Sequence, residues 1–121
     1  MRVMVTGHRG YIGTVMTPIL LAAGHDVVGY DSDLYERCTF RHGGTLVDVP
    51  SLRKDVRDVQ SSDLEGLDAV IHLAALSNDP LGDLNPDITY EINYHGSVRM
   101  AEAAKKAGVP RFLFASSCSN Y

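Results

Sequence analysis

The sequence predicts an α/β fold, built as a doubly wound parallel sheet that is truncated after its fifth strand. Short apolar runs rich in β-branched residues alternate along the chain with stretches of helical periodicity, and this alternation is typical of βαβ units. A glycine-rich segment also lies at the first junction between strand and helix. Because crossovers between parallel strands are right-handed, these observations favour the doubly wound sheet.

The first part of the chain predicts two strands with a helix between them. Residues 2–6 form a short β-branched run, and a helical pattern follows over 11–23. Gly24 is a natural cap for the end of that helix. Pro18 lies inside the pattern, where it removes one hydrogen bond and usually kinks the helix axis. The second strand is predicted over 26–30, so the first βαβ unit begins with these elements.

Three further strands are expected downstream. The third lies within 46–56, where Pro50 marks an interruption, and a short helix follows over 62–67. The fourth, over 68–73, is apolar enough to be buried on both faces. The fifth is predicted over 111–115.

A long helix connects the fourth strand to the fifth. Asn85 provides a helix N-cap and Pro86 suits the first helical position. The helix is expected to extend to about Ala107, where Gly108 ends it. One face has helical spacing and carries Thr89, Ile92, Asn93, Gly96, Met100, Ala103 and Ala107. The small residues on this face would let the helix lie close to a sheet.

Composition excludes several classes of protein. The 121 residues fit one domain, and 45% hydrophobic residues, 21% charged residues and a net charge of −4 are typical of a soluble globular protein. No run approaches the ~20 apolar residues of a membrane helix, and the start of the chain lacks the apolar core of a signal peptide. The acidic balance argues against binding to nucleic acid. Cysteines and histidines show no metal-ligand spacing, so we expect a cytoplasmic protein without a metal site.

The glycine-rich segment predicts a phosphate-binding loop. Its spacing is GxxGxxG, formed by Gly7, Gly10 and Gly13 between the first strand and the first helix. Gly7 would permit a tight turn, Gly10 would let a pyrophosphate approach the backbone, and Gly13 would let the helix pack on the strand. Free N–H groups at the helix start favour an anion. The alternative interpretation is three structural glycines in a turn.

Asp31 at the end of the second strand supports a dinucleotide site. It lies 18 residues after Gly13, where a carboxylate can accept hydrogen bonds from both ribose hydroxyls of an adenosine. Its charge would repel a 2′-phosphate, which favours NAD over NADP as the cofactor. Arg9 argues in the other direction, because a guanidinium in the loop could bind that phosphate. We weigh Asp31 more heavily; the alternative is a turn residue at a strand end.

Six short segments of the chain match motifs of a known protein family. The matching pieces, in order, are Thr6-Gly-His-Arg-Gly-Tyr-Ile-Gly13, Val28-Gly-Tyr-Asp31, Asp55-Val-Arg-Asp58, His72-Leu-Ala-Ala75, Asn93-Tyr-His-Gly96 and Phe114-Ala-Ser-Ser-Cys-Ser-Asn-Tyr121. The chain resembles the N-terminal half of an extended short-chain dehydrogenase/reductase of the NAD-dependent sugar epimerase/dehydratase family. Each piece is weak alone, but together they cover the chain. The resemblance implies a Rossmann-like NAD-binding domain over residues 1–121.

The resemblance implies a set of cofactor-binding residues. They are Gly7, Arg9, Gly10, Tyr11, Ile12, Gly13, Asp31, Asp55, Val56, Leu73, Ala74, Ala75, Ser77 and Asn93. In the family, the residue matching Asp55 accepts from the adenine amino group, beside the backbone of Val56. The segment 73–75 lies along the cofactor, with Ser77 near the nicotinamide ribose. The residue matching Asn93 supports the active-site loops. The alternatives are a surface carboxylate at Asp55, ordinary helix–sheet packing for 73–75, and for Asn93 a polar residue on the helix face that is satisfied by a nearby carbonyl.

The resemblance also implies a catalytic hydroxyl at Ser117. This side chain would hydrogen-bond the substrate oxygen that gains or loses a proton as hydride moves. The family's Tyr-x-x-x-Lys motif does not occur in these 121 residues, and Tyr121 is not its equivalent. We therefore expect an incomplete NAD-binding domain from a longer, cytoplasmic and homodimeric enzyme that acts on a nucleotide sugar. The alternatives are a non-catalytic NAD-binding module, regulatory or partner-binding, and a doubly wound domain without a nucleotide.

Overall fold

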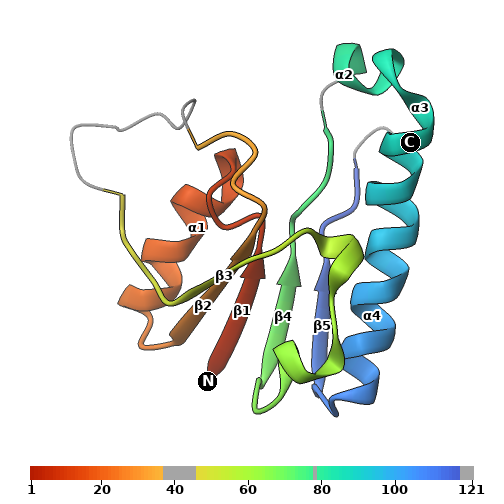
Figure 1. Ribbon diagram of the computed structural model, residues 1–121. Coiled ribbons are helices and arrows are strands. Elements are labelled where there is room, and N and C mark those ends of the chain that lie inside the picture. The colour runs from red at the N-terminus through yellow and green to blue at the C-terminus, as the bar shows by residue number, and fades with distance from the viewer. Residues whose placement is uncertain (37–45, 78, 118–121) are drawn as a thin grey trace.

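The computed structural model describes residues 1–36, 46–77 and 79–117. Within these ranges the strands are β1 (Arg2–Thr6), β2 (Asp26–Asp31), β3 (Ser51–Arg53), β4 (Ala69–His72) and β5 (Arg111–Phe114). They form one parallel sheet in the order β3-β2-β1-β4-β5 (Figure 1). The α/β doubly wound prediction is confirmed. The strand order reverses between β1 and β4, which is the position where such sheets bind ligands.

Burial on both faces explains the apolar sequences of the central strands. In β1, Val3 and Val5 contribute to one core cluster, whereas Met4 contributes to the other. Successive side chains of a strand point to opposite faces of the sheet, so a central strand that is covered on both faces is mostly apolar. Val70 in β4 lies in the same cluster as Met4, and both side chains are 0% exposed.

Helices cover the two faces of the sheet unequally. Helix α1 (Tyr11–Ala22) lies on one face, and Pro18 is inside it as the sequence indicates. The other face is covered by the 3-10 turns η1 (Val56–Asp58) and η2 (Ser61–Leu64) and by helix α4 (Ser97–Lys106) (Figure 1). The helix expected over 62–67 is thus the short turn η2. In the described part of the chain, no helix is long and apolar enough to cross a membrane.

The long helix between β4 and β5 is continuous but changes its winding. It consists of α3 (Pro86–Tyr90), the π-helical segment η3 (Glu91–Gly96) and α4. Asn85 is the N-cap as predicted, and its Oδ1 accepts a hydrogen bond from the Ile88 N–H at 3.2 Å. The predicted face is also confirmed, because Gly96, Met100 and Ala103 are buried.

The polar segment before this helix is also partly helical. The short helix α2 (Asp79–Leu84) is an element that the sequence pattern did not predict. Its last turn is close to α3 at the top of the view in Figure 1. A helix of 6 residues has little helical periodicity to detect, which explains why the sequence pattern did not reveal it.

The loops that follow β1, β2, β4 and β5 meet at one edge of the sheet. All strands are parallel, so their carboxyl ends lie together (Figure 1). Main-chain hydrogen bonds hold the loop starts to neighbouring strands: the Gly7 N–H donates to the Tyr30 carbonyl at 2.8 Å, and the Ala115 N–H donates to the His72 carbonyl at 3.1 Å. This edge therefore brings together segments that are far apart in the sequence.

Candidate functional site

The loop between β1 and α1 can be built only with glycine at two of its positions. Gly7 has a φ of +71°, and a Cβ there would lie 3.0 Å from the Ala74 nitrogen. A Cβ at Gly13 would overlap the Gly7 carbonyl oxygen and the backbone of His8. A side chain at either glycine would push neighbouring backbone segments apart, because the nearest atoms at both positions belong to the backbone and not to a flexible side chain. The tight turn predicted at Gly7 is therefore present, and Gly13 lets α1 pack closely against the loop that follows β1.

The start of α1 is open to an anion. Gly10 is the N-cap residue, and no side chain caps the helix or places an acid in its first turn. A Cβ at Gly10 would meet only the Gly7 carbonyl oxygen, at 3.2 Å. The first N–H groups of a helix lack intrahelical partners, and the helix dipole favours negative charge there. The geometry thus fits a pyrophosphate group. Tyr11 and Ile12 follow in the first turn, 89% and 55% exposed.

Asp31 is held in a fixed orientation at the end of β2. Its Oδ2 accepts a hydrogen bond from the Arg9 N–H at 3.0 Å, and its Oδ1 accepts one from the Asp33 N–H at 2.9 Å. The Arg9 amide belongs to the phosphate loop, so the carboxylate and the loop are joined directly. A carboxylate oxygen can accept more than one hydrogen bond. Asp31 therefore keeps acceptor capacity for hydroxyl groups.

His8 is a site residue that the sequence analysis missed. Its side chain is 5% exposed and its Nδ1 lies 3.8 Å from Oδ2 of Asp31. The ring occupies the space above Gly29, where any Cβ would overlap it. Burial lowers the pKa of His8, although the nearby Asp31 acts in the opposite direction. The only sequence signal was its place inside the glycine motif, which says nothing about burial.

The side chain of Arg9 forms ion pairs with two acidic side chains. Its Nε lies 3.5 Å from Oδ1 of Asp33, and a terminal nitrogen lies 3.9 Å from the exposed Asp48. Asp33 also pairs with Arg53, across 3.5 Å. Sequence reasoning considered Arg9 as a phosphate ligand but overlooked Asp33, two residues beyond Asp31.

Asp55 is preceded by β3 and begins η1. Its carboxylate forms a two-pronged pair with Arg57, at 3.0 Å to Nε and 2.7 Å to a terminal nitrogen. The guanidinium holds the pKa of Asp55 below its usual range. The neighbouring Val56 is buried, and a Cβ on Gly96 of the long helix would lie 2.9 Å from its Cγ2. Close helix packing therefore positions the backbone beside Asp55.

The loop after β4 is clamped from two directions. The hydroxyl oxygen of Thr6 accepts hydrogen bonds from the N–H groups of Leu73 and Ala74, each at 3.1 Å. Asn93 contacts the backbone of Leu76 twice: its Oδ1 accepts from the N–H at 2.8 Å and its Nδ2 donates to the carbonyl at 2.9 Å. The exposed Ala75 lies between these two clamps. Asn93 thus holds the backbone of this loop at Leu76.

A buried chain of hydrogen bonds connects these clamps. Thr6 Oγ1 already accepts two N–H groups, so its own proton is directed to Nδ1 of His72, at 2.8 Å. The neutral His72 ring then donates from Nε2 to Ser97 Oγ at 2.9 Å, and Ser97 donates to the Asn93 carbonyl at 2.7 Å. Burial lowers the pKa of His72 to about 4, which keeps the ring neutral at physiological pH.

The two remaining predicted residues lie in exposed segments at the same edge. Ser77 follows the clamped loop, and Ser117 follows β5. Residues 118–121, the end of the last matching motif, lie outside the described residues. The loops after β1, β2, β4 and β5 thus all lie at the carboxyl end of the sheet. Among the described residues, no three His, Cys, Asp or Glu side chains are grouped to hold a metal ion.

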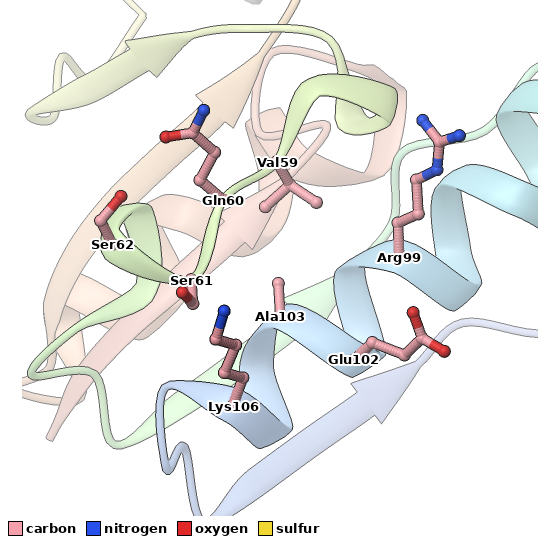
Figure 2. Close-up of a pocket in the computed structure, with 8 residues that line it drawn as sticks. All are labelled: Val59, Gln60, Ser61, Ser62, Arg99, Glu102, Ala103 and Lys106. Carbon is pink, nitrogen blue, oxygen red and sulfur yellow. The ribbon is translucent and has the colours of Figure 1, made fainter.

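Two surface cavities lie beside the long helix. One of about 480 Å³ lies between the η2 region and α4 and is lined by residues including Ser61, Arg99 and Lys106 (Figure 2). None of the predicted site residues lines it. The other, of about 510 Å³, is lined by Asn93 and Tyr94 together with residues of α2 and α3. The second cavity therefore adjoins the clamped loop, whereas the first does not.

Comparisons with known proteins converge on one group. The family model described as "NAD dependent epimerase/dehydratase family" matches residues 3–121. The chain is 36% identical to a UDP-glucose 4-epimerase of Mycolicibacterium smegmatis, over 97% of this chain and 39% of that relative. It is 32% identical to a UDP-glucose 4-epimerase of Klebsiella pneumoniae, over 100% of this chain and 92% of that relative.

Solved structures show the same likeness. A UDP-glucose-4-epimerase from Stenotrophomonas maltophila, with bound NAD and formylated UDP-arabinopyranose, has a TM-score of 0.83 and 30% identity. The match covers 98% of this chain and 38% of that one. A dTDP-glucose 4,6-dehydratase from Streptomyces venezuelae, with NAD and TYD bound, has a TM-score of 0.78 and 28% identity, over 93% of this chain and 38% of that one. The chain thus spans about two fifths of the length of these structures.

Proposed function

Because the chain belongs to the NAD dependent epimerase/dehydratase family, we propose that residues 1–121 form an incomplete NAD-binding domain of a nucleotide-sugar epimerase or dehydratase. The observation that carries the proposal is the pairing of Asp31 with the phosphate loop. The Arg9 N–H that donates to Asp31 lies one residue before Gly10, the N-cap of α1. A ribose acceptor and an open helix N-terminus are therefore joined at one place.

Each part of the cofactor has proposed ligands in this chain. The pyrophosphate would contact the loop and first turn formed by Gly7, Arg9, Gly10, Tyr11, Ile12 and Gly13. The adenosine ribose would be bound by Asp31, and the adenine by Asp55 with the backbone of Val56. Leu73, Ala74, Ala75 and Ser77 would lie along the remainder of the cofactor, supported by Asn93. Support comes from the position of all these groups at one edge of the sheet.

The proposed reaction takes place on a sugar carbon. When bound, NAD supplies the acceptor and donor of hydride. The hydroxyl of Ser117 would hydrogen-bond the sugar oxygen whose proton is exchanged during the reaction. Support comes from relatives named UDP-glucose 4-epimerase and from structures described with UDP-sugars. By the same resemblance we propose that the full-length protein is cytoplasmic and forms a homodimer. Sedimentation of the purified full-length protein would test the homodimer.

Calorimetric titration with NAD tests the cofactor proposal. We expect the wild-type protein to bind NAD and both site variants to weaken binding at least about tenfold. In Gly10→Val the added side chain would occupy the space through which a pyrophosphate approaches the backbone, and Asp31→Ala removes the carboxylate that would accept charge-assisted hydrogen bonds from the ribose. Asp26→Ala is the matched control, since Asp26 lies at the opposite end of β2 and pairs with Arg2 at 3.5 Å. Unchanged binding in both site variants would show that the loop and carboxylate are wrongly assigned.

A further inference from the structure

We propose that Asp33 makes the nucleotide site select NAD over its 2′-phosphorylated form, by neutralising Arg9 and Arg53. This inference rests on the proposed NAD-binding function and concerns how that site discriminates. A carboxylate at the position of Asp31 is one source of selectivity. The structure assigns a second source to Asp33, because two arginines next to Asp31 would otherwise be available to a phosphate.

The first step is that both arginines lie beside Asp31. The backbone N–H of Arg9 donates to the Asp31 carboxylate at 3.0 Å. Arg53 is the register partner of Asp31 in the neighbouring strand β3. Arginine side chains bind phosphate through paired, charge-assisted hydrogen bonds. The position that repels a 2′-phosphate is therefore flanked by two groups that attract it.

The second step is that a single buried carboxylate holds both guanidinium groups. Oδ1 of Asp33 lies 3.5 Å from Nε of Arg9, and Oδ2 lies 3.5 Å from Nε of Arg53. The Asp33 side chain is only 8% exposed, whereas those of Arg9 and Arg53 are 34% and 65% exposed. Water screens charges less at a buried site, so the charge of Asp33 acts on both guanidinium groups with less screening than the charge of an exposed acid.

Two other acids face the same arginines from more exposed positions. Glu36 lies 3.3 Å from Arg53, and Asp48, whose side chain is 91% exposed, lies 3.9 Å from Arg9. Exposed pairs of this kind contribute little, because solvent screens them and the side chains lose entropy when they pair. Removing Asp33 should therefore release the arginines even though Glu36 and Asp48 remain.

The third step is that the backbone of Asp33 is adapted to this place. Its φ is +57°, and no other non-glycine residue in the described ranges has a positive φ. Asp and Asn tolerate this conformation better than most residues. The Asp33 N–H donates to Oδ1 of Asp31 at 2.9 Å. Because Asn retains both the conformation and the N–H, Asp33→Asn removes the charge while leaving the support of Asp31 in place.

The test compares the Kd values of NAD and NADP by calorimetric titration of the purified protein. We expect the wild type to prefer NAD. We expect Asp33→Asn to lower the Kd for NADP at least about tenfold, as one new charge-assisted pair would, and to change the Kd for NAD less than about threefold. Asp26→Asn is the control, because it removes the same charge from a carboxylate that pairs with an arginine, Arg2, at the far end of β2.

Two further variants make the test specific. Adding Arg9→Ala and Arg53→Ala to Asp33→Asn should abolish the gain in NADP affinity, because those side chains are the proposed ligands. Asp33→Gly removes the carboxylate and suits a φ of +57°, so it provides a second route if Asp33→Asn folds poorly, which circular dichroism would detect. If both Asp33 variants left the ratio of the two Kd values unchanged, the inference about Asp33 would be overturned and the proposed NAD-binding function would stand. Absence of NAD binding by the wild type would overturn the proposed function as well.

Discussion

His72 shows how a single residue is constrained by its neighbours. Its ring takes part in a chain of three hydrogen bonds that all point the same way. Thr6 donates to the ring, the ring donates to Ser97, and Ser97 donates to the Asn93 carbonyl. A protonated ring would have to donate from both nitrogens, and Nδ1 faces a hydroxyl whose acceptor capacity is already used by two N–H groups. The hydrogen-bond network and burial therefore favour the same neutral form.

The lowered pKa of His72 predicts a pH-dependent stability. In the folded state burial lowers the pKa of His72 to about 4, from its ordinary value of 6.5. Between these values the unfolded chain binds a proton that the folded chain does not, so the free energy of unfolding should fall as the pH drops from 6.5 to 4. The contribution is at most about 3 kcal/mol. Urea unfolding at several pH values should show a shallower dependence in His72→Gln.

The same comparison separates His72 from other titrating groups. The pKa of His8 is also lowered by burial, and its contribution has the same sign. Because His8 is present in both proteins, the difference between wild type and His72→Gln isolates His72. Parallel pH profiles, offset only by a constant loss of stability, would contradict the assignment of a neutral buried ring.

Ser117 is the residue whose role rests most on resemblance. If its hydroxyl donates to the substrate oxygen, Ser117→Ala should lower kcat of the full-length enzyme about 100-fold. The Kd for NAD should be unchanged, because the proposed contact is with the sugar. Ser116→Ala is the neighbouring control, and we expect its kcat to be near that of the wild type. A larger loss in Ser116→Ala than in Ser117→Ala would transfer the role to the neighbour.

At the scale of the element, the π-helical segment Glu91–Gly96 distinguishes the long helix from a regular one. It contains Asn93, which contacts Leu76, and it ends at Gly96, which packs against Val56. Segments of this winding are often found at functional sites. Here the segment connects the loop after β4 with the turn after β3, so one helix supports two parts of the site.

Asn93 provides the test of this connection. Asn93→Ala removes two hydrogen bonds to Leu76, and each such bond is worth about 1 kcal/mol. We expect amide hydrogen exchange in the segment 73–77 to accelerate and the Kd for NAD to rise several-fold. Thr89→Ala, which removes an exposed hydrogen bond to the Asn85 carbonyl on the same helix, should leave exchange in that segment unchanged. Equal acceleration in both variants would indicate general loosening of the helix.

At the scale of the whole molecule, the carboxyl edge of the sheet is where the proposed site is assembled. Residues from β1, β2, β4 and the long helix contribute to it, and their hydrogen bonds join Thr6 to Leu73 and Arg9 to Asp31. A ligand bound across these loops contacts several strands at once. Ligand binding should therefore stabilise the folded state as a unit.

Thermal unfolding tests this expectation. At an NAD concentration 100 times its Kd, linkage predicts about 2.7 kcal/mol of added stability, and 1 kcal/mol shifts the Tm of a domain of this size by about 4–8 °C. Calorimetric scans should therefore show a Tm raised by roughly 10 °C or more. Asp31→Ala at the same NAD concentration should show a much smaller shift. Equal shifts in the two proteins would indicate NAD binding elsewhere on the molecule.

The sequence alone was sufficient for most of the fold. Alternation of apolar runs with helical patterns reflects local periodicity, which is why the order of strands and helices and the N-cap at Asn85 were predicted correctly. The tight turn at Gly7 and the strand end at Asp31 were also predicted, because both leave local signals in the sequence. Local periodicity did not reveal the π-helical winding, since its stabilising contacts come from distant residues.

What the sequence determined by itself is the set of elements and the residues with local signatures. The tertiary structure alone decided which distant side chains meet. His8 above Gly29, Asp33 between Arg9 and Arg53, and the path from Thr6 through His72 all depend on contacts across strands. Burial and pairing set the charge state of a group and its availability to a ligand, and both are properties of the folded surroundings rather than of a residue's place in the chain.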